Sequence, residues 1–275
     1  MPSPTEVEEL EIGLFLRAIH ARYGYRFQDY APGSMQRRVR AALARSGLRN
    51  LGELQHQLLT DPRCFASVLD DLTVRVSDLF RDPPFFRALR EKIAPLLRTY
   101  PVVKIWHAGC ASGEEAYSAA ILLSELGLYD RTQIYATDMS PSALDMARAG
   151  VYTEDRVASF EQNYRDSGGQ RSLADYFSSA YGRVAVREEL RRNIVFFQHD
   201  LTVDYALGEM QLVFCRNVLI YLGKALRARA LATFSDCLSH GGFLCLGMNE
   251  GMPSDAPLSF AEFLPRERIY RKGPA

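Results

Sequence analysis

The chain has 275 residues, 47% of them hydrophobic, which suffices for one large or two modest domains with real cores. Lys and Arg total 33, as do Asp and Glu, so the net charge of +0 excludes a global field that would attract nucleic acid or an anionic membrane. Five cysteines without a CxxC pair, an acidic N-terminus and no long apolar run predict a cytoplasmic protein without membrane insertion.

Residues 1–78 are predicted to form an all-helical N-terminal domain. Apolar residues recur at helical spacing from about residue 6 to 72, and residues 29–33, with Pro and Gly, interrupt the pattern. Residues 79–100 are expected to be a linker and the first helix of a second domain. The residues expected on the buried helical faces are Leu10, Leu14, Ile19, Met35, Val39, Ala42 and Leu43.

Residues 101–275 change to short β-branched runs that alternate with helical stretches, which predicts a doubly wound, Rossmann-like α/β domain with a mainly parallel sheet. The polar stretch from about 151 to 192 does not fit one crossover helix and is read as an inserted small β subdomain. The expected strands are 102–107, 133–137, 194–198, 212–215 and 243–246, with a last edge strand at 269–271, and the expected helices are 113–126, 140–149 and 224–238.

A turn rich in small residues follows the first of these strands. Between Ala108 and Gly113 the backbone is open to close approach by a ligand. Asp138 stands 25 residues after Gly113, at the end of the second strand, where a carboxylate can accept from both hydroxyls of a ribose. Tight packing of strand on helix is the alternative interpretation of the turn, but the turn and the spaced acid together favour recognition of an adenosine.

The first helical residues after this turn are Glu114 and Glu115, and two carboxylates there would repel the phosphates that a helix N-terminus otherwise attracts. S-adenosylmethionine carries a sulfonium and an ammonium and no phosphate, so the pair favours it over NAD. One of the two acids can serve only the helix dipole. We favour Glu115 as the ligand-binding residue.

Three further motifs extend the pattern along the chain. Residues 110–118 read CASGEEAYS, residues 136–140 read ATDMS, and residues 214–222 read FCRNVLIYL. The helical domain contains QRRVR at 36–40 and the linker contains VRVSDLFRD at 74–82. This combination, with GGFLCLG at 241–247, resembles the CheR-type chemotaxis receptor methyltransferases over nearly the whole chain.

The resemblance implies a class I methyltransferase of a bacterial signalling system. Members of this family transfer the methyl group of S-adenosylmethionine to glutamate side chains of chemoreceptors during adaptation, with S-adenosylhomocysteine as product. Catalytic roles are implied for Arg81 and Tyr221. The implied or expected cofactor-binding residues are Ser77, Arg81, Ala108, Gly109, Glu115, Asp138, Met139, Asp200, Leu201, Arg216 and Asn217.

The chain departs from the family pattern at three positions. Arg75, Asp200 and Gln211 stand where the family has Asn, Asn and Asp, which predicts altered cofactor contacts. Two alternatives therefore stay open: a catalytically weak S-adenosylmethionine-binding signalling module, and a methyltransferase that acts on RNA or a small molecule.

Methyl transfer from a sulfonium to a carboxylate needs alignment and desolvation more than a strong base. Arg81 and Tyr221 are the candidates to hold one carboxylate oxygen while the other attacks. No residue spacing indicates a metal site, and we expect His107 and His199 to be structural or rim residues.

A basic helix in the helical domain, with Arg38, Arg45 and Arg49 on one face, is the candidate partner surface. Five arginines without an acid are by default a solvated face, whereas the resemblance implies a docking surface for acidic receptor helices; nucleic-acid binding is the competing interpretation. The short loop at 178–182 lacks the glycine-rich turn of members that bind a receptor pentapeptide, so we expect no such tether. The arginines are Arg37, Arg38, Arg40, Arg45 and Arg49.

Overall fold

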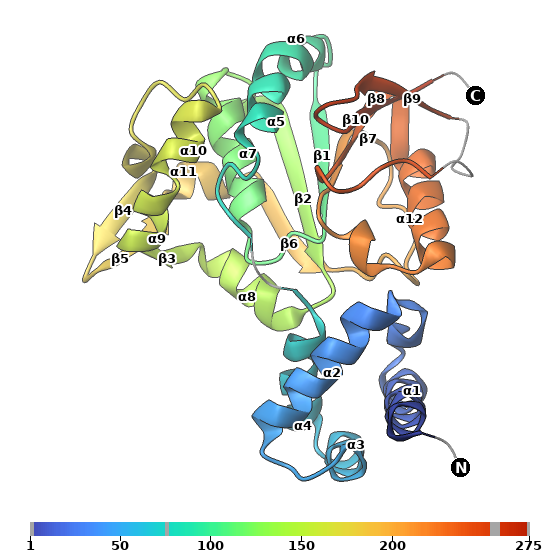
Figure 1. Ribbon diagram of the computed structural model, residues 1–275. Coiled ribbons are helices and arrows are strands. Elements are labelled where there is room, and N and C mark those ends of the chain that lie inside the picture. Colours follow the sequence, from blue (N-terminus) through green and yellow to red (C-terminus); the bar gives the residue numbers. More distant parts are fainter. Residues whose placement is uncertain (1–2, 75–76, 254–258, 274–275) are drawn as a thin grey trace. The chain divides into compact units, whose positions relative to one another are not determined.

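A computed structural model describes residues 3–74, 77–253 and 259–273 of the chain (Figure 1). The chain divides into two compact units. The first comprises Met1–Val74 together with Ile220–Arg229, and the second comprises Arg75–Leu219 together with Ala230–Ala275. Within the described ranges, no helix has both the length and the apolar character needed to cross a membrane.

The first unit is helical, as predicted. Ser3 begins the first helix through a reciprocal capping box with Glu6, and Asn50 caps the third by accepting from the N–H of Glu53. Prolines at the first helical position begin the second and fourth helices. The helices are α1 (Pro4–Tyr23), α2 (Pro32–Ser46), α3 (Leu51–Thr60) and α4 (Pro62–Leu72), with a 3-10 turn, η1, at Phe27–Asp29.

The buried face of α1 differs from the prediction. Leu10 and Leu14 are 60% and 47% exposed, whereas Ile19 is buried as expected. The helix has a second apolar stripe, and it is this stripe that is buried. At 100° per residue, positions 10 and 14 share one face and the buried positions share another, so periodicity could not choose between them. The buried residues of α1 are Ile12, Phe15, Leu16 and Ile19.

Residues 220–229 join the first unit through backbone hydrogen bonds to the segment around η1. The N–H of Ala31 donates to the carbonyl of Tyr221 at 2.9 Å, and the N–H of Gly223 donates to the carbonyl of Asp29 at 3.0 Å. A Cβ atom on Gly223 would lie 2.3 Å from that carbonyl oxygen, so only glycine fits. The guanidinium of Arg38 lies 4.3 Å above the ring of Tyr221.

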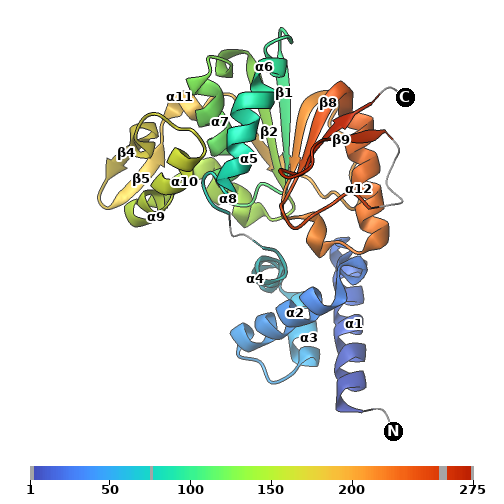
Figure 2. The ribbon, with the colours of Figure 1, turned by 45° about the horizontal axis from the view of Figure 1, so that its top comes forward.

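The second unit is built on a seven-stranded sheet (Figures 1 and 2). The strands β6, β2, β1, β7 and β8 pair in parallel in that order, and β10 and then β9 continue the sheet antiparallel. The six predicted strands are found, but β9 was missed, and it forms the edge that had been assigned to β10. The strands are β1 (Val103–Ala108), β2 (Thr132–Asp138), β6 (Ile194–Gln198), β7 (Met210–Cys215), β8 (Leu238–Leu246), β9 (Phe260–Leu264) and β10 (Ile269–Lys272).

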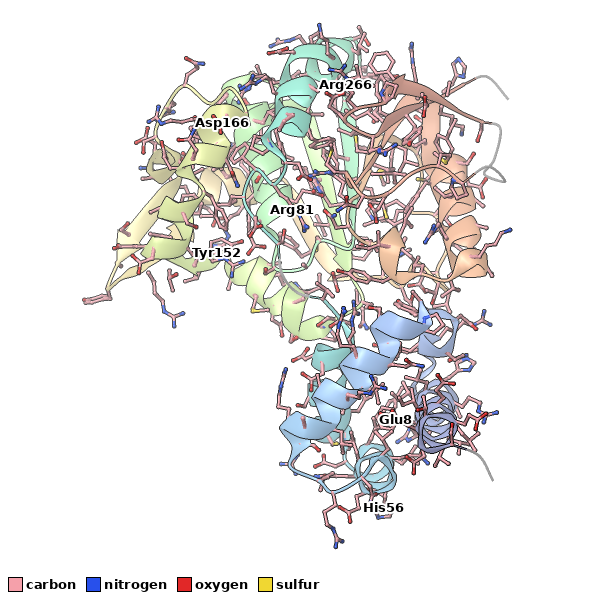
Figure 3. All side chains as sticks on the ribbon, viewed as in Figure 1. Glu8, His56, Arg81, Tyr152, Asp166 and Arg266 are labelled. Carbon is pink, nitrogen blue, oxygen red and sulfur yellow. The ribbon has the colours of Figure 1, made fainter. Side chains whose placement is uncertain are left out.

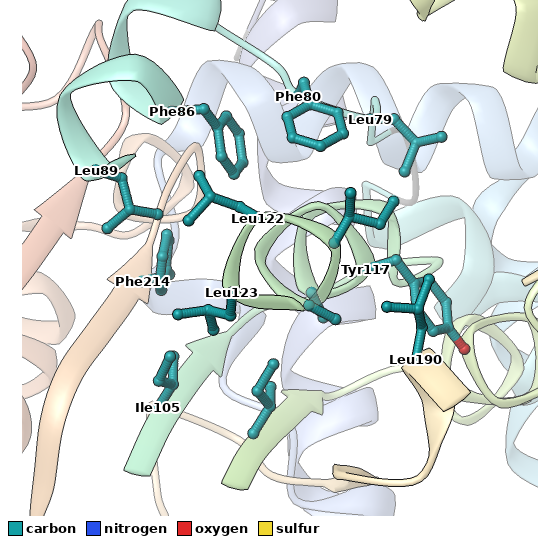
Figure 4. Packing of buried hydrophobic residues seen from close by; sticks show 14 of the residues in the cluster. Leu79, Phe80, Phe86, Leu89, Ile105, Tyr117, Leu122, Leu123, Leu190 and Phe214 are labelled. Atoms are coloured by element: carbon teal, nitrogen blue, oxygen red, sulfur yellow. The ribbon is translucent and has the colours of Figure 1, made fainter. Parts of the chain in front are cut away.

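Alternate residues of β1 face opposite sides of the sheet. Ile105 belongs to the core that includes residues of α7 (Glu114–Glu125), and Figure 4 shows it near Leu123 of that helix. Trp106 points the other way, with its ring centroid 5.4 Å from that of Phe234 on α12 (Lys224–Cys237).

Apart from those of the insertion between β2 and β6, the helices that follow the first unit's α4 are α5 (Pro83–Ala88), a π turn η2 (Leu89–Ile93), α6 (Ala94–Leu97), α7 (Glu114–Glu125), α8 (Pro141–Ala149) and α12 (Lys224–Cys237), with 3-10 turns η3 (Tyr129–Arg131) and η5 (Leu219–Tyr221).

The predicted insertion between β2 and β6 contains a three-stranded antiparallel sheet in the order β3-β5-β4. Tyr181 and Gly182, both with positive φ, form its tight hairpin turn. The elements of the insertion are β3 (Val151–Thr153), α9 (Glu154–Ser159), α10 (Glu161–Asp166), η4 (Leu173–Tyr176), β4 (Phe177–Ala180), β5 (Arg183–Val186) and α11 (Glu188–Arg191). The predicted fold class, a helical region followed by an α/β domain with a small inserted sheet, is therefore confirmed.

Candidate active site

Most of the predicted cofactor-binding residues lie where the parallel strands β6, β2, β1 and β7 end. The register pairs Ala108 of β1 with Thr137 of β2, and Asp138 of β2 with Gln198 of β6. The segments that follow these strands therefore leave the sheet at one edge, which is where doubly wound sheets bind ligands. At the carboxyl ends of these strands, or directly after them, lie Ala108, Gly109, Asp138, Met139, Asp200, Leu201, Arg216 and Asn217.

The turn between β1 and α7 is fixed by its backbone. Gly109 has a φ of +80°, and its N–H and that of Cys110 both donate to the carbonyl of Thr137 at 2.8 Å. A Cβ atom on Gly109 would lie 2.5 Å from Cγ2 of Val218. Glycine is thus required here by both conformation and space. Tyr152 of the insertion, labelled in Figure 3, donates to the carbonyl of Ser112 at 2.9 Å.

Asp138 connects this turn to the next one. Its Oδ2 accepts from the N–H of Ala111 and its Oδ1 accepts from the N–H of Ser140, both at 2.9 Å. Burial raises the pKa of Asp138, and these backbone hydrogen bonds oppose that shift. A carboxylate oxygen can accept more than one hydrogen bond, so the geometry is compatible with hydroxyl donors of a ribose.

Arg216 is the centre of an ionic cluster at this edge. Its guanidinium is completely buried, and it donates from Nη1 to Oε2 of Glu115 at 2.8 Å and from Nη2 to Oδ2 of Asp82 at 2.6 Å. Both terminal nitrogens also lie 3.3 Å from the carbonyl oxygen of Arg81. The guanidinium carbon, Cζ, lies 3.9 Å from the ring centroid of Phe85. The linker before α5 is thereby joined to α7 and to the end of β7.

The two acids that begin α7 have different environments. Burial acts to raise the pKa of Glu115, but Arg216 and then His107 hold it below the ordinary value, and its side chain is 16% exposed. Glu114 is buried, accepts from Ser112 Oγ and from Arg156 at 2.8 Å, and has a pKa raised by burial. Both acids have internal partners, but Glu114 is closed off from solvent whereas Glu115 is partly open.

Asn217 follows Arg216 in a left-handed conformation, with a φ of +61°. Its N–H donates to Oε2 of Glu250 at 2.8 Å, and the N–H of Gly247 donates to the same oxygen at 2.6 Å. Glu250 is only 5% exposed. This buried acid joins the loops that follow β7 and β8, and it fixes the backbone of Asn217.

The other predicted residues occupy the surrounding loops. Asp200 begins a turn in which its Oδ1 accepts from the N–H of Thr202 at 2.8 Å, and Leu201 is buried. The carbonyl of Met139 accepts from Gln198 at 3.2 Å. Ser77 presents its carbonyl to Arg156 at 2.8 Å.

The three departures from the family pattern have different positions. Arg75 lies outside the described residues. Asp200 lies two residues after the end of β6, at the edge of the sheet where the parallel strands end. Gln211 lies near the beginning of β7 and accepts from the N–H of Lys104 at 2.8 Å, so it supports strand pairing at the opposite end of the sheet.

The five arginines of the first unit do not form the single helical surface that was predicted. Arg38 is 8% exposed and donates to the carbonyl of Leu72, and Arg49 lies beyond the end of α2. Helix α2 ends at Ser46 before Gly47, which is left-handed, and this places Arg49 outside the helical period. Arg40 and Arg45 are exposed and form ion pairs with Glu8 and Asp71.

Sequence reasoning missed three participants in this site. Asp82 was visible as the last residue of the linker motif, but nothing local showed that it contacts Arg216. Glu250 lies in a loop without a recognisable motif. His107 was set aside for lack of metal partners, yet its Nδ1 lies 3.3 Å from Oε1 of Glu115. In the part of the chain that the structure describes, no group of His, Cys, Asp and Glu residues is arranged to hold a metal ion.

A helical N-terminal unit followed by a mixed α/β sheet with a small inserted sheet is the architecture of a class I S-adenosylmethionine-dependent methyltransferase. Residues 75–264 match the family described as "CheR methyltransferase, SAM binding domain", and residues 10–73 match "CheR methyltransferase, all-alpha domain". The chain therefore belongs to the CheR methyltransferase family.

Curated relatives resemble the chain over nearly its whole length. "Putative methyltransferase Cher3" of Pseudomonas putida is 44% identical over 265 residues, which cover 96% of this chain and 97% of that protein. "Chemotaxis protein methyltransferase 1" of Vibrio cholerae is 30% identical over 257 residues, covering 90% of each chain. The family and its cofactor agree with the predictions made from the sequence.

Solved structures give only distant similarity. The N-methyltransferase NodS from Bradyrhizobium japonicum, bound to S-adenosylhomocysteine, is 18% identical with a TM-score of 0.33, covering 61% of this chain and 63% of that one. The glycopeptide N-methyltransferase MtfA, bound to S-adenosylmethionine, is 14% identical with a TM-score of 0.36, covering 74% and 62%.

Proposed function

We propose that this CheR-family enzyme methylates glutamate side chains on the cytoplasmic helices of a bacterial chemoreceptor, and that it does so in the cytoplasm. The observation that carries the proposal is the cluster around Arg216. This residue joins the backbone of Arg81 to the carboxylate of Glu115, while the guanidinium of Arg81 has no ion-pair partner among the described residues. A cation for the acceptor carboxylate is thus held beside an anion for the cofactor.

The residues of the strand edge fit S-adenosylmethionine. Glu115 would hold its ammonium group and Asp138 its ribose hydroxyls, with the turn at Ala108 and Gly109 against the nucleoside. Asp200 and Leu201 would flank the adenine. The remaining proposed cofactor contacts are Ser77, Arg81, Met139, Arg216 and Asn217.

The bound cofactor supplies an electrophilic methyl group on a sulfonium. Arg81 would bind one oxygen of the substrate glutamate, so that the other oxygen is free for an in-line attack, and the motif match implies the same role for Tyr221. Two opposite charges are neutralised in this step, so exclusion of water favours it and no general base is needed. Tyr221 belongs to the first unit, and its assignment rests on its motif.

The test uses the full chain, methyl-labelled S-adenosylmethionine and a chemoreceptor cytoplasmic fragment. Glutamyl methyl esters release labelled methanol in alkali, whereas methylated nitrogen or carbon does not. We expect alkali-labile label on the receptor fragment. Stable label, or cofactor binding without transfer, would refute the proposal in favour of another substrate or a silent binding module.

Variants test the catalytic assignments. Arg81→Ala and Tyr221→Phe should each lower kcat about 10- to 100-fold, which is more than they weaken the affinity for S-adenosylmethionine. Arg266→Ala removes an exposed arginine of the second unit, labelled in Figure 3, and is the matched control. Unchanged turnover in either variant would remove that residue from the mechanism.

We further propose that acidic receptor helices dock on the exposed arginines of the first unit, namely Arg37, Arg40 and Arg45. Such docking weakens with salt, because exposed charges are screened. The tight hairpin at Tyr181 and Gly182 supports receptor binding without a C-terminal pentapeptide. Tight, specific capture of the chain by a receptor tail peptide would contradict this second point.

A further inference from the structure

His107 lies at the penultimate position of β1 with its ring only 1% exposed. The ring stacks on Phe214 of β7, with centroids 4.2 Å apart and planes inclined by 13°. Its Nδ1 points to α7 and lies 3.3 Å from Oε1 of Glu115, while the other oxygen of that carboxylate is bound by Arg216. The imidazole is therefore held between the sheet and the proposed cofactor carboxylate.

The partners of the ring determine where its proton lies. Glu115 is paired with Arg216 and has a lowered pKa, so it is an acceptor at neutral pH and Nδ1 of His107 must donate. The Nε2 atom is buried and has no hydrogen-bond partner in the described part of the chain. The surroundings thus place a proton on Nδ1, directed at Glu115.

We propose that His107 is a positioning residue for cofactor binding, which holds one oxygen of Glu115 while Arg216 holds the other. The inference rests on the proposed role of Glu115. A carboxylate fixed at both oxygens has one orientation, and each oxygen keeps a lone pair for a further donor. The carboxylate is then already oriented when the ammonium group of S-adenosylmethionine binds, so binding costs less free energy of ordering.

A purely structural histidine would also be buried and stacked, so the test must separate packing from the hydrogen bond. His107→Leu keeps apolar volume but removes the donor, whereas His107→Asn places an amide N–H near the position of Nδ1. We expect the Kd for S-adenosylmethionine, measured by calorimetry, to rise about tenfold in His107→Leu and to stay within about threefold of wild type in His107→Asn. His240→Asn, at an exposed histidine of β8, is the control.

The coupling to Glu115 provides a second measurement. In a Glu115→Gln background, His107→Leu should change the Kd less than about twofold, because the carboxylate that it positions is gone. Should His107→Leu fail to fold, as judged from its melting temperature, His107→Gln replaces it, since its amide reaches the position of Nε2 and not that of Nδ1. Equal losses in the Asn and Leu (or Gln) variants, or an equal effect in both backgrounds, would overturn the inference.

The outcomes separate this inference from the proposed site. If Glu115→Gln alone leaves the Kd for S-adenosylmethionine unchanged, the assignment of Glu115 fails and the inference with it. If Glu115→Gln weakens binding while His107→Leu does not, only the inference about His107 fails.

Discussion

Arg216 and Asp82 form an ion pair of 2.6 Å although 134 residues separate them in the sequence. The guanidinium is completely buried, and Asp82, which has a φ of +59°, begins α5 without capping it through its side chain. The carboxylate of Asp82 is therefore directed to Arg216 and not to its own helix. This pair fixes the segment that carries Arg81 against the end of β7.

Removal of Arg216 should be strongly destabilising. Arg216→Met would leave Glu115 and Asp82 without their cation, and breaking a buried ion pair on one side costs about 3–5 kcal/mol. Denaturant unfolding would measure the free energy of unfolding. Arg148→Met, which removes an exposed pair with Asp145, is the control and should cost less than about 0.5 kcal/mol. Similar losses in both variants would contradict the central role of Arg216.

Gly109→Ala should combine two penalties. The left-handed backbone costs about 1–2 kcal/mol for an L-residue, and contact with Val218 adds to it. Gly127→Ala is the control, because Gly127 has a φ of +65° and open space around it. In a Val218→Ala background the cost of Gly109→Ala should fall to that of the control. A cost that does not depend on residue 218 would exclude the steric contribution.

The two acids that begin α7 should give opposite pH dependences of stability. For Glu115, with a pKa below the ordinary 4.5, the unfolded chain binds more protons in the window just below pH 4.5, so this contribution to stability is lost as pH falls. For Glu114, with a pKa above 4.5, the folded chain binds more protons in the window just above it, so stability falls as pH rises through that window.

Glu115→Gln should therefore flatten the pH profile of the free energy of unfolding below about pH 4.5, and Glu114→Gln should flatten it above that value. Urea unfolding between about pH 3.5 and 6.5 would measure both profiles. Glu91→Gln, at an exposed position, should leave the profile unchanged. Slopes of the same sign for the two acids would contradict their different environments.

Glu250 should stabilise the loop that carries Asn217. Glu250→Ala would leave the N–H groups of Asn217 and Gly247 without their acceptor, which costs about 1–3 kcal/mol for each group that stays unsatisfied. Glu250→Gln keeps an oxygen that can accept from both, so it should lose less. Thermal unfolding and the Kd for S-adenosylmethionine would be compared for the two variants. An equal loss in both would show that the charge, not the acceptor, is what matters.

Much of the site could be predicted from local sequence. The small residues around Gly109 and the acid at 138 follow from what a strand-to-helix turn and the end of a strand require. Both lie within one βαβ unit, where strand order and handedness leave few alternatives. The preference for Glu115 over Glu114 stays a prediction, and only the structure shows how their partners differ: Arg156 pairs with Glu114 and Arg216 with Glu115.

The errors have separate causes, and the first is that periodicity describes a helix but not its neighbours. Leu10 and Leu14 form a stripe as regular as the one that is buried. Arg49 continued the spacing of the basic residues, but Gly47 had already ended the helix. Strand β9 is five residues long and none of them is buried, so its pattern was too weak to predict an edge strand.

By itself the sequence determined the fold class and the cofactor, because local spacing of apolar, small and acidic residues specifies strands, turns and a ligand-binding edge. The family followed from the resemblance of its motifs to those of known members. Only the tertiary structure decided which charges meet. Arg216, Asp82, Glu115 and His107 come from four separate segments, and no local pattern encodes their contact. Burial away from water is what forces these groups to pair with one another, because a buried charge without a partner is costly.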